Sequence, residues 1–283
     1  MIPNLSILIG GLDNAGIELV DILVNDGHDT IVYGPCPDRF QLKLSELCDK
    51  HPGKIKHFDP GPLSEDFDDI VATAISHGYR CHVYHLADYD EVVFSRTFIQ
   101  NTMSVLRFLE TIRIRPGQIG GLLLLPFSTA ANTVYSAAKR SNELLAESYL
   151  SSFGVDLRIV KSVPAFGPTV ANRTLETVLK RIILGDPITV YNHPTALVPG
   201  RALAEKLYAT MQDRTARVTI GGLVMIDQDL YTRLANGAGK PLITHLRVVE
   251  EGPVPTSSSV SETEFFNYLD AYLKHMAAAE KRA

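Results

Sequence analysis

A short apolar strand that runs into a glycine-rich turn and a helix is the feature that most constrains this fold. Residues 5–9 are apolar except for Ser6, and Gly10, Gly11 and Gly16 follow them. Residues 15–26 then carry apolar side chains at helical spacing. A strand, a glycine turn and a helix in this order predict the first unit of a parallel α/β sheet. The N-terminus of such a helix can bind an anion such as a pyrophosphate.

Strand-like and helix-like segments alternate through the first two thirds of the chain. The fifth strand is apolar throughout, as expected of a parallel strand covered on both faces. This alternation predicts an α/β fold with a Rossmann-type, doubly wound parallel sheet. The expected strands after the first are residues 30–33, 55–58, 81–86, 122–125 and 157–160, and the expected helices are 39–50, 67–76, 94–114 and 135–153.

The alternation weakens after Pro164, which predicts a second, smaller lobe. We expect a dinucleotide-binding domain over residues 1–164, to which residues 201–222 return, and a small substrate lobe with C-terminal helices over residues 165–283. The later expected helices are 174–184, 201–212, 227–236 and 262–279, the expected strands are 188–191 and 218–220, and residues 252–261, rich in Pro and Ser, form a loop.

Composition narrows the class of protein. The chain has 283 residues and a net charge of −5, so nothing indicates a nucleic-acid-binding surface. Cys36, Cys48 and Cys81 lack the spacing of metal ligands and fit a reducing compartment. No apolar run approaches the ~20 residues of a membrane helix, and the first residues do not show the basic, apolar and small-residue pattern expected of a secretory leader. We therefore expect a soluble, cytoplasmic protein without a bound metal.

A tyrosine and a lysine four residues apart begin the helix that follows the fifth strand. Tyr135 and Lys139 share one face of that helix. A nearby ammonium lowers the pKa of a phenol from its usual value of about 10, which makes the phenol a proton acceptor and donor near neutral pH. A hydroxyl from the end of the strand, first Thr129 and then Ser128, is expected to orient a substrate oxygen. The alternative is an exposed helix pair without chemistry.

These motifs, in this order, resemble the extended short-chain dehydrogenase/reductase family, which includes sugar-nucleotide epimerases and dehydratases. The resemblance spans residues 4–222 and rests on the glycine loop, on Tyr135 to Lys139, and on the segments 83–87, 161–168 and 185–191. It implies NAD or NADP as cofactor, a small-molecule substrate that is a nucleotide sugar, and a homodimer built from the helices 94–114 and 135–153. It also implies epimerase, dehydratase or ketoreductase activity.

The resemblance assigns further residues to the site. It implies that Asn101 is a structural asparagine. Asp88 and Asp90 follow the fourth strand and could line the mouth of the pocket, but the simpler interpretation is that both are solvated loop carboxylates. The implied cofactor contacts are Gly10, Gly11, Asp13, Asn14, Ala15, Gly16, Gly34, Arg39, Asp59, Leu86, Ala87, Lys139 and Pro164, and the implied substrate contacts are Asp88, Arg173, Tyr191 and Arg201.

Three departures from the family pattern keep other functions open. Asp13 takes the place of the middle glycine, where it either faces the pyrophosphate or caps the helix. Gly34 stands where NAD-binding proteins usually carry an acid, and Arg39 is either a partner for a 2′-phosphate or a surface charge. Thr129 lies only six residues before Tyr135, which leaves a short loop between them. The alternative is therefore a non-catalytic protein of this fold that binds a dinucleotide or a protein partner; an enzyme without redox chemistry is a third possibility.

The expected fourth strand contains two histidines, which are candidate metal ligands. His85 ends the apolar fourth strand, and we expect a hydrogen-bonded core histidine there. His82 lies three residues before it, but the sequence offers no convincing third ligand.

Overall fold

The chain divides into two structural units. A computed structural model describes residues 4–59, 66–88, 94–126, 133–168, 170, 172–191, 194–239, 244–247 and 261–280. The first unit comprises residues 1–162 and 204–219, and the second comprises residues 163–203 and 220–283.

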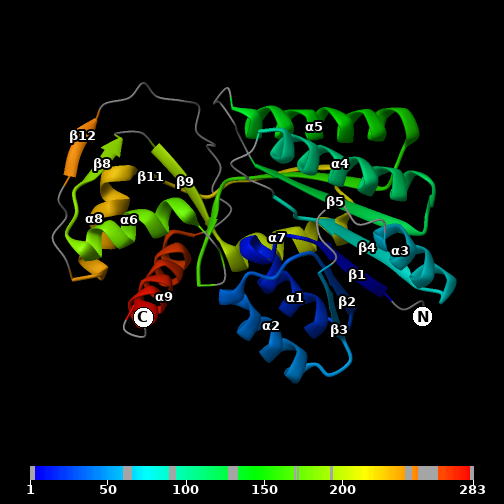
Figure 1. Cartoon of the computed structure of the whole chain (residues 1–283), viewed down its shortest axis with the longest axis horizontal. Helices are drawn as coiled ribbons and strands as arrows, with labels where there is room; N and C mark the ends of the chain where they lie inside the picture. Colours follow the sequence, from blue (N-terminus) through cyan, green and yellow to red (C-terminus); the bar gives the residue numbers. More distant parts are fainter. Residues whose placement is uncertain are drawn as a thin grey trace. The chain divides into compact units, whose positions relative to one another are not determined.

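The first unit is built around one seven-stranded sheet with the order β10-β6-β5-β4-β1-β2-β3 (Figure 1). β1 lies at its centre, where Leu5 is paired with Asp29 of β2 and with Cys81 of β4, both in parallel. This is the predicted Rossmann-type, doubly wound α/β fold. The strands are β1 (Asn4–Ile9), β2 (Asp29–Tyr33), β3 (Ile55–Phe58), β4 (Arg80–His85), β5 (Ile119–Pro126), β6 (Leu157–Ser162) and β10 (Arg217–Ile220).

Helices cover both faces of this sheet, because side chains of successive strand residues point to opposite faces. Leu5, Ile7 and Ile9 of β1 pack in a core with Phe108 and Ala146 of the helices on one face. That face is covered by α3 (Asp66–Ser76), α4 (Phe94–Arg113) and α5 (Val134–Phe153), and the other by α1 (Ile17–Asn25), α2 (Asp38–Lys50) and α7 (Gly200–Asp213) (Figure 1).

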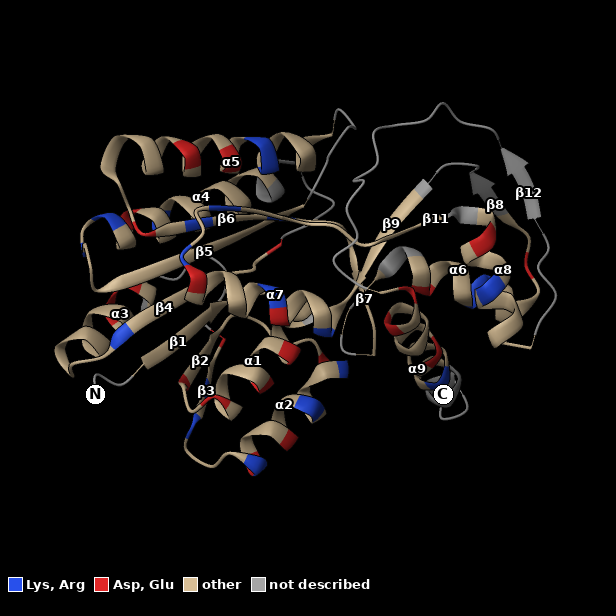
Figure 2. Cartoon of the chain, turned by 180° about the vertical axis from the view of Figure 1, so that it is seen from behind, with Lys and Arg blue, Asp and Glu red and all other residues tan. Residues whose placement is uncertain are grey.

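The outer surfaces of α1 and α2 carry charged side chains. Figure 2 shows acidic residues on α1 and charged residues of both signs along α2. Within the part of the chain that the structure describes, no helix combines the length and the apolar character needed to cross a membrane.

Buried polar side chains lie on the sheet face opposite α4 and α5. Ser6 of β1 is bonded through its hydroxyl to Nδ1 of His28 at 2.8 Å, and it is paired in register with His82 of β4. The rings of the two histidines are 5.8 Å apart between their centroids. On β6, Arg158 is buried and donates to Oδ1 of Asp156 at 2.6 Å. Of these residues, only His82 was considered from the sequence, as a candidate metal ligand.

The second unit contains two small sheets. β9 (Pro194–Pro199) lies between antiparallel β11 (Leu223–Ile226) and parallel β7 (Ala165–Phe166), and β8 (Ile188–Tyr191) is paired in parallel with β12 (Thr244–Arg247). The helices are α6 (Arg173–Leu184), α8 (Asp227–Gly237) and α9 (Glu262–Glu280). The ring of Phe166 contacts those of Phe265, Tyr268 and Tyr272, which attaches α9 to this core.

The predicted helices begin and end close to the observed ones, whereas β7, β9, β11 and β12 were not predicted. β7 has only two residues, so it carries no periodicity. β9 begins and ends with a proline, which argues against a strand in a sequence. These short strands form only through their partners, which lie far away in sequence.

Candidate active site

The glycine loop turns the chain sharply after β1. Gly10 and Gly11 have φ angles of +63° and +72°, in the left-handed region that glycine adopts without strain. A π-helical turn, η1 (Leu12–Gly16), follows, and the N–H of Gly16 donates to the carbonyl of Gly11 at 2.9 Å. Gly11 is the N-cap, and Asp13 lies inside the turn. The interpretation of Asp13 as the N-cap is therefore wrong, because two glycines of positive φ let the helical turn begin two residues earlier.

The same glycines let the loop pack directly against the end of β4. A Cβ on Gly10 would lie 2.8 Å from Cα of Ala87, and one on Gly11 would overlap the Cβ of Leu86. A Cβ on Gly16 would lie 2.5 Å from the carbonyl oxygen of Gly11. The loop is thus a cradle of backbone at the carboxyl edge of the sheet. The first N–H groups of its helical turn suit a pyrophosphate.

The end of β2 closes the other side of this loop. The N–H of Gly10 donates to the carbonyl of Tyr33 at 2.9 Å, and a Cβ on Gly34 would lie 3.3 Å from the nitrogen of Gly10. Nε2 of His57 on β3 lies 2.8 Å from the carbonyl oxygen of Gly34, a contact that the sequence analysis missed. No acid occupies position 34. The exposed Arg39 places its guanidinium 4.8 Å from the ring centroid of Phe40.

Tyr135 and Lys139 meet a single carboxylate, that of Asp88. The Tyr135 hydroxyl donates to Oδ2 of Asp88 at 2.7 Å, and the Lys139 ammonium lies 2.8 Å from Oδ1 of the same side chain. The ammonium is also 5.3 Å from the centroid of the Tyr135 ring. Asp88 is 41% exposed, as expected of a loop carboxylate, and it also contacts both members of the pair.

Lys139 is held from the other side by α4. Its ammonium donates to Oδ1 of Asn101 at 2.8 Å, and the amide of Asn142 donates to the carbonyl of Asn101 at 3.3 Å. The Lys139 side chain is only 5% exposed. A buried ammonium needs oxygen partners, because burial without them is costly. The expected structural asparagine is thus a direct partner of the lysine.

His85 is the core histidine that the sequence predicts. It is fully buried at the end of β4, and its Nε2 lies 2.8 Å from the hydroxyl of Ser104 on α4. Burial, followed by the nearby charge of Lys139, lowers its pKa to about 3. His85 is therefore neutral at physiological pH and adds no charge beside Lys139.

A capping box fixes the start of α5. The hydroxyl of Thr133 accepts from the N–H of Ser136 at 3.1 Å, and the N–H of Thr133 donates to the Ser136 hydroxyl at 3.0 Å. This reciprocal pair begins the helix at Val134, which puts Tyr135 in its first turn and Lys139 one turn later. The position of Tyr135 and Lys139 along the helix is thus set by the capping box, which is a local sequence signal.

The other predicted site residues fall into three groups. The backbone at Asp13, Asn14 and Ala15 lies in η1, and Asp59 is exposed just after β3. In the second unit, the N–H of Arg201 donates to the hydroxyl of Tyr268 at 3.3 Å, and the carbonyl of Pro164 accepts from Val198 at 3.1 Å. Outside the description lie Ser128, Thr129 and Asp90, together with the side chains of Asp13, Asn14, Arg173 and Tyr191.

The titratable residues do not form a metal centre in the part of the chain that the structure covers. No group of three or more His, Cys, Asp and Glu side chains there has the arrangement of a metal site. The three cysteines are unpaired, and Cys81 is buried.

Comparison with known proteins relates the whole chain to one group of solved enzymes. No protein-family model and no curated protein sequence matches it. Among solved structures, dTDP-glucose 4,6-dehydratase from Bacillus anthracis in complex with NAD has a TM-score of 0.79 at 12% identity, covering 98% of both chains. UDP-glucuronic acid 4-epimerase from Bacillus cereus in complex with UDP-glucuronic acid and NAD has a TM-score of 0.78 at 16% identity, covering 97% of this chain and 99% of the other.

A third enzyme has the same architecture. Thermus thermophilus UDP-glucose 4-epimerase in complex with NAD has a TM-score of 0.72 at 17% identity, covering 97% of this chain and 99% of the other. The relation is therefore one of fold and not of close sequence. The chain has the fold of the NAD-dependent sugar-nucleotide epimerases and dehydratases.

Proposed function

We propose that this protein binds NAD or NADP and acts on a nucleotide sugar as an epimerase, dehydratase or ketoreductase. One observation carries the proposal: the glycine loop and the Tyr135–Lys139 pair contact the same short segment at the end of β4. Gly10 and Gly11 pack against Ala87 and Leu86, as described above, and the next residue, Asp88, contacts Tyr135 and Lys139. A dinucleotide on the loop would therefore extend toward the phenol.

The residues at this edge have separate roles in the proposed reaction. Tyr135 removes the proton from a substrate hydroxyl, so that the substrate O–H bond breaks and a phenolic O–H bond forms. Lys139, held by Asn101, supplies the positive charge that favours the phenolate. Thr129, or Ser128 in its place, orients the substrate oxygen. A bound nicotinamide supplies the hydride-accepting and hydride-donating chemistry.

The cofactor is held mainly by backbone. In this proposal the N–H groups of η1, including those of Asp13, Asn14 and Ala15, face the pyrophosphate, and Asp59 accepts from the adenine amino group. Lys139 would also bond the nicotinamide ribose, and the backbone near Pro164 would contact the carboxamide. The absence of an acid at Gly34 removes one barrier to NADP, and Arg39 would then contact its 2′-phosphate.

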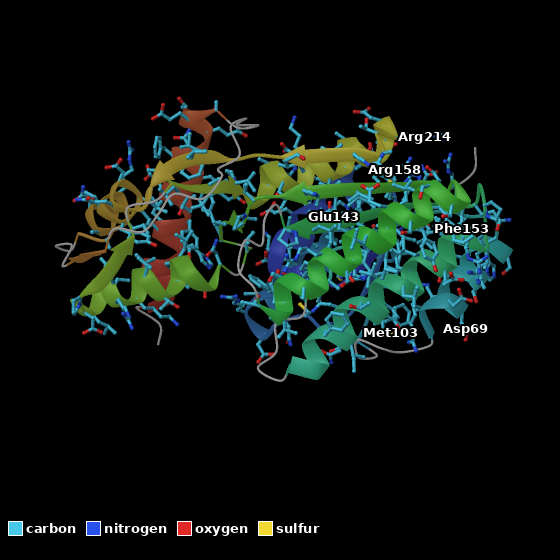
Figure 3. The ribbon with its side chains drawn as sticks, turned by 90° about the horizontal axis from the view of Figure 1, so that it is seen from above. Asp69, Met103, Glu143, Phe153, Arg158 and Arg214 are labelled. Atoms are coloured by element: carbon cyan, nitrogen blue, oxygen red, sulfur yellow. The ribbon has the colours of Figure 1, made fainter. Side chains whose placement is uncertain are left out.

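The proposed substrate is a nucleotide sugar, and the proposed assembly is a homodimer. Each of the three related enzymes carries a nucleotide sugar in its name, which supports this class of substrate for the present chain. Asp88, Arg173, Tyr191 and Arg201 are the proposed substrate contacts. A second copy of the chain is the proposed partner of α4 and α5, whose exposed apolar side chains include Ile99, Met103, Leu144 and Phe153. Figure 3 shows Met103 on α4 and Phe153 on α5.

Replacement of Tyr135 tests the catalytic part. Tyr135→Phe should lower turnover about 100-fold or more with a set of nucleotide sugars, the range expected on loss of a positioned proton-transfer group. Tyr79→Phe is the matched control, because the Tyr79 hydroxyl also donates to a carboxylate, that of Asp29 at 2.9 Å, at another place on the sheet. Unchanged turnover of Tyr135→Phe would eliminate this mechanism.

A non-catalytic dinucleotide-binding or partner-binding protein is the second candidate. The contacts of Asp88 with Tyr135 and Lys139 favour this candidate, because both proposed catalytic groups are already bound to a side chain of the same protein. Calorimetric titration with NAD⁺ and NADP⁺ separates the candidates. Binding of either one together with turnover supports the enzyme, binding without turnover supports the dinucleotide-binding form, and no binding at all supports the partner-binding form.

A further inference from the structure

The proposed substrate contact does not account for the way in which the carboxylate of Asp88 binds Tyr135 and Lys139. Its two oxygens are used separately: Oδ2 accepts from the Tyr135 hydroxyl at 2.7 Å, and Oδ1 lies 2.8 Å from the Lys139 ammonium. A phenol that donates to a carboxylate is stabilised in its protonated form, and a carboxylate close by opposes formation of a phenolate. The same carboxylate offsets the positive charge of Lys139, which would otherwise favour the phenolate.

The position of Asp88 is fixed by the fold. The preceding residue, Ala87, is buried against Gly10, so the backbone that carries Asp88 cannot retreat toward the glycine loop. On the other side, α5 is fixed by its capping box at Thr133, and Lys139 is fixed by Asn101. The contact between Asp88 and the pair is therefore a consequence of rigid elements on both sides.

Two opposite charges lie next to the phenol. In the described part of the chain, the titratable and charged groups that face the cluster include Asp88 after β4, His85 in β4 and Lys139 in α5, while α4 contributes the neutral Asn101. Burial keeps His85 neutral, since its pKa is lowered to about 3. The Asp88 carboxylate and the Lys139 ammonium therefore have opposite effects on the ionisation of the phenol.

We propose that Asp88 is a positioning residue that keeps Tyr135 protonated in the free protein, so that the phenol is set to donate a proton at neutral pH and accepts one only as the pH rises. The catalytic meaning of this inference rests on the proposed function. In that reaction, Tyr135 would give its proton readily to a carbonyl oxygen being reduced. Removal of a proton from an alcohol would require the phenolate and would therefore increase with pH.

The ionisation of Tyr135 can be measured without cofactor or substrate. Protein containing tyrosine labelled at Cζ would be titrated by NMR, with the Tyr135 resonance identified from its loss in Tyr135→Phe. In Asp88→Asn, the pH at which half of Tyr135 is ionised should fall by about 1 to 3 units, which is about 10-fold to 1000-fold in the ionisation equilibrium. The 41% exposure of Asp88 favours the lower end of this range.

Two further variants make the test specific. Asp88→Glu keeps the charge and should restore most of the original midpoint, and Asp69→Asn removes an exposed carboxylate from α3 and should leave it unchanged. A midpoint in Asp88→Asn equal to that of the unmodified chain would overturn the inference. If the chain turns over a substrate, the alkaline limb of the oxidation rate should move to lower pH in Asp88→Asn by the same amount.

The two proposals fail in different ways. A shifted Tyr135 midpoint with turnover that does not depend on Tyr135 would leave the inference standing and reject the proposed function. An unshifted midpoint with turnover that requires Tyr135 would do the reverse.

Discussion

The ammonium of Lys139 on α5 lies 2.8 Å from the side-chain oxygen of Asn101 on α4, 38 residues earlier in the chain. This bond ties the two helices together beneath the site. Near the other end of α5, the hydroxyl of Tyr149 donates to Glu110 of α4. The two helices are therefore fixed to each other by polar contacts near both ends, and the functional group of Lys139 is part of that connection.

Loss of the Asn101 side chain should destabilise the first unit. Asn101→Ala removes one oxygen partner from an ammonium that is 5% exposed, and we expect the free energy of unfolding to fall by about 1–3 kcal/mol. Urea denaturation measures this change. Asn25→Ala is the control, because Asn25 is exposed on α1 and bonds only to Asp21 of the same helix. Equal effects of the two variants would show that Asn101 has no special role.

The close contact of the glycine loop with β4 predicts a difference between two glycines. Gly11→Ala should cost about 1–2 kcal/mol of stability for the left-handed backbone and about 1–3 kcal/mol more for overlap with Leu86. Gly27→Ala should show only the first cost, because Gly27 also has positive φ, +87°, but no atom lies within 4 Å of its would-be Cβ. Chemical denaturation of both variants gives the comparison, and similar losses would contradict the packing argument.

Much of the first unit could be predicted from the sequence because its signals are local. The apolar run of β1, the glycines after it and the helical spacing that follows act within a few residues of each other. Tyr135 and Lys139 were found for the same reason, since four residues along a helix define one face. The alternation of strands and helices then allows few topologies other than the observed strand order.

The contacts that give the site its character could not be predicted, because they join distant segments. Asp88 is 47 residues from Tyr135, and whether its carboxylate faces solvent or the phenol depends on the tertiary structure. The bond between His57 and Gly34 is likewise made across two strands. The π turn at η1 also departed from expectation, since it depends on the left-handed backbone of Gly10 and Gly11.

The buried histidines predict that the protein loses stability in mild acid. Burial lowers the pKa of His82 from 6.5 to about 4, and burial also lowers that of His28. Between these pH values the unfolded chain binds a proton that folded His82 does not, so stability decreases as pH falls through this window. From about pH 7 to about pH 5, His82 alone should cost about 2 kcal/mol.

A variant isolates this contribution. His82→Gln removes the titrating group, so its free energy of unfolding should fall by about 2 kcal/mol less than that of the unmodified chain over the same pH interval. Urea denaturation at the two pH values provides the measurement. His77→Gln is the control, because His77 is exposed at the end of α3 and should not alter the pH dependence. The same acid sensitivity in His82→Gln and the unmodified chain would exclude His82 as a source.

The exposed apolar side chains of α4 and α5 lead to a prediction about assembly. Leu144 is 68% exposed at the middle of α5, and Met103 and Phe153 lie on the same pair of helices (Figure 3). If a second copy covers this face about a two-fold axis, Leu144 meets its own symmetry mate or a near neighbour. Leu144→Glu would then place like charges close together in an apolar contact and should weaken the dimer at least 10-fold.

Sedimentation over a range of concentrations measures this dimerisation. The control is Leu42→Glu on α2, where the leucine is similarly exposed, at 72%, but lies on the opposite side of the sheet from α4 and α5. We expect the unmodified chain and Leu42→Glu to sediment as dimers and Leu144→Glu to shift toward the monomer. A monomeric unmodified chain, or a dimer that Leu144→Glu leaves intact, would reject α4 and α5 as the contact between copies.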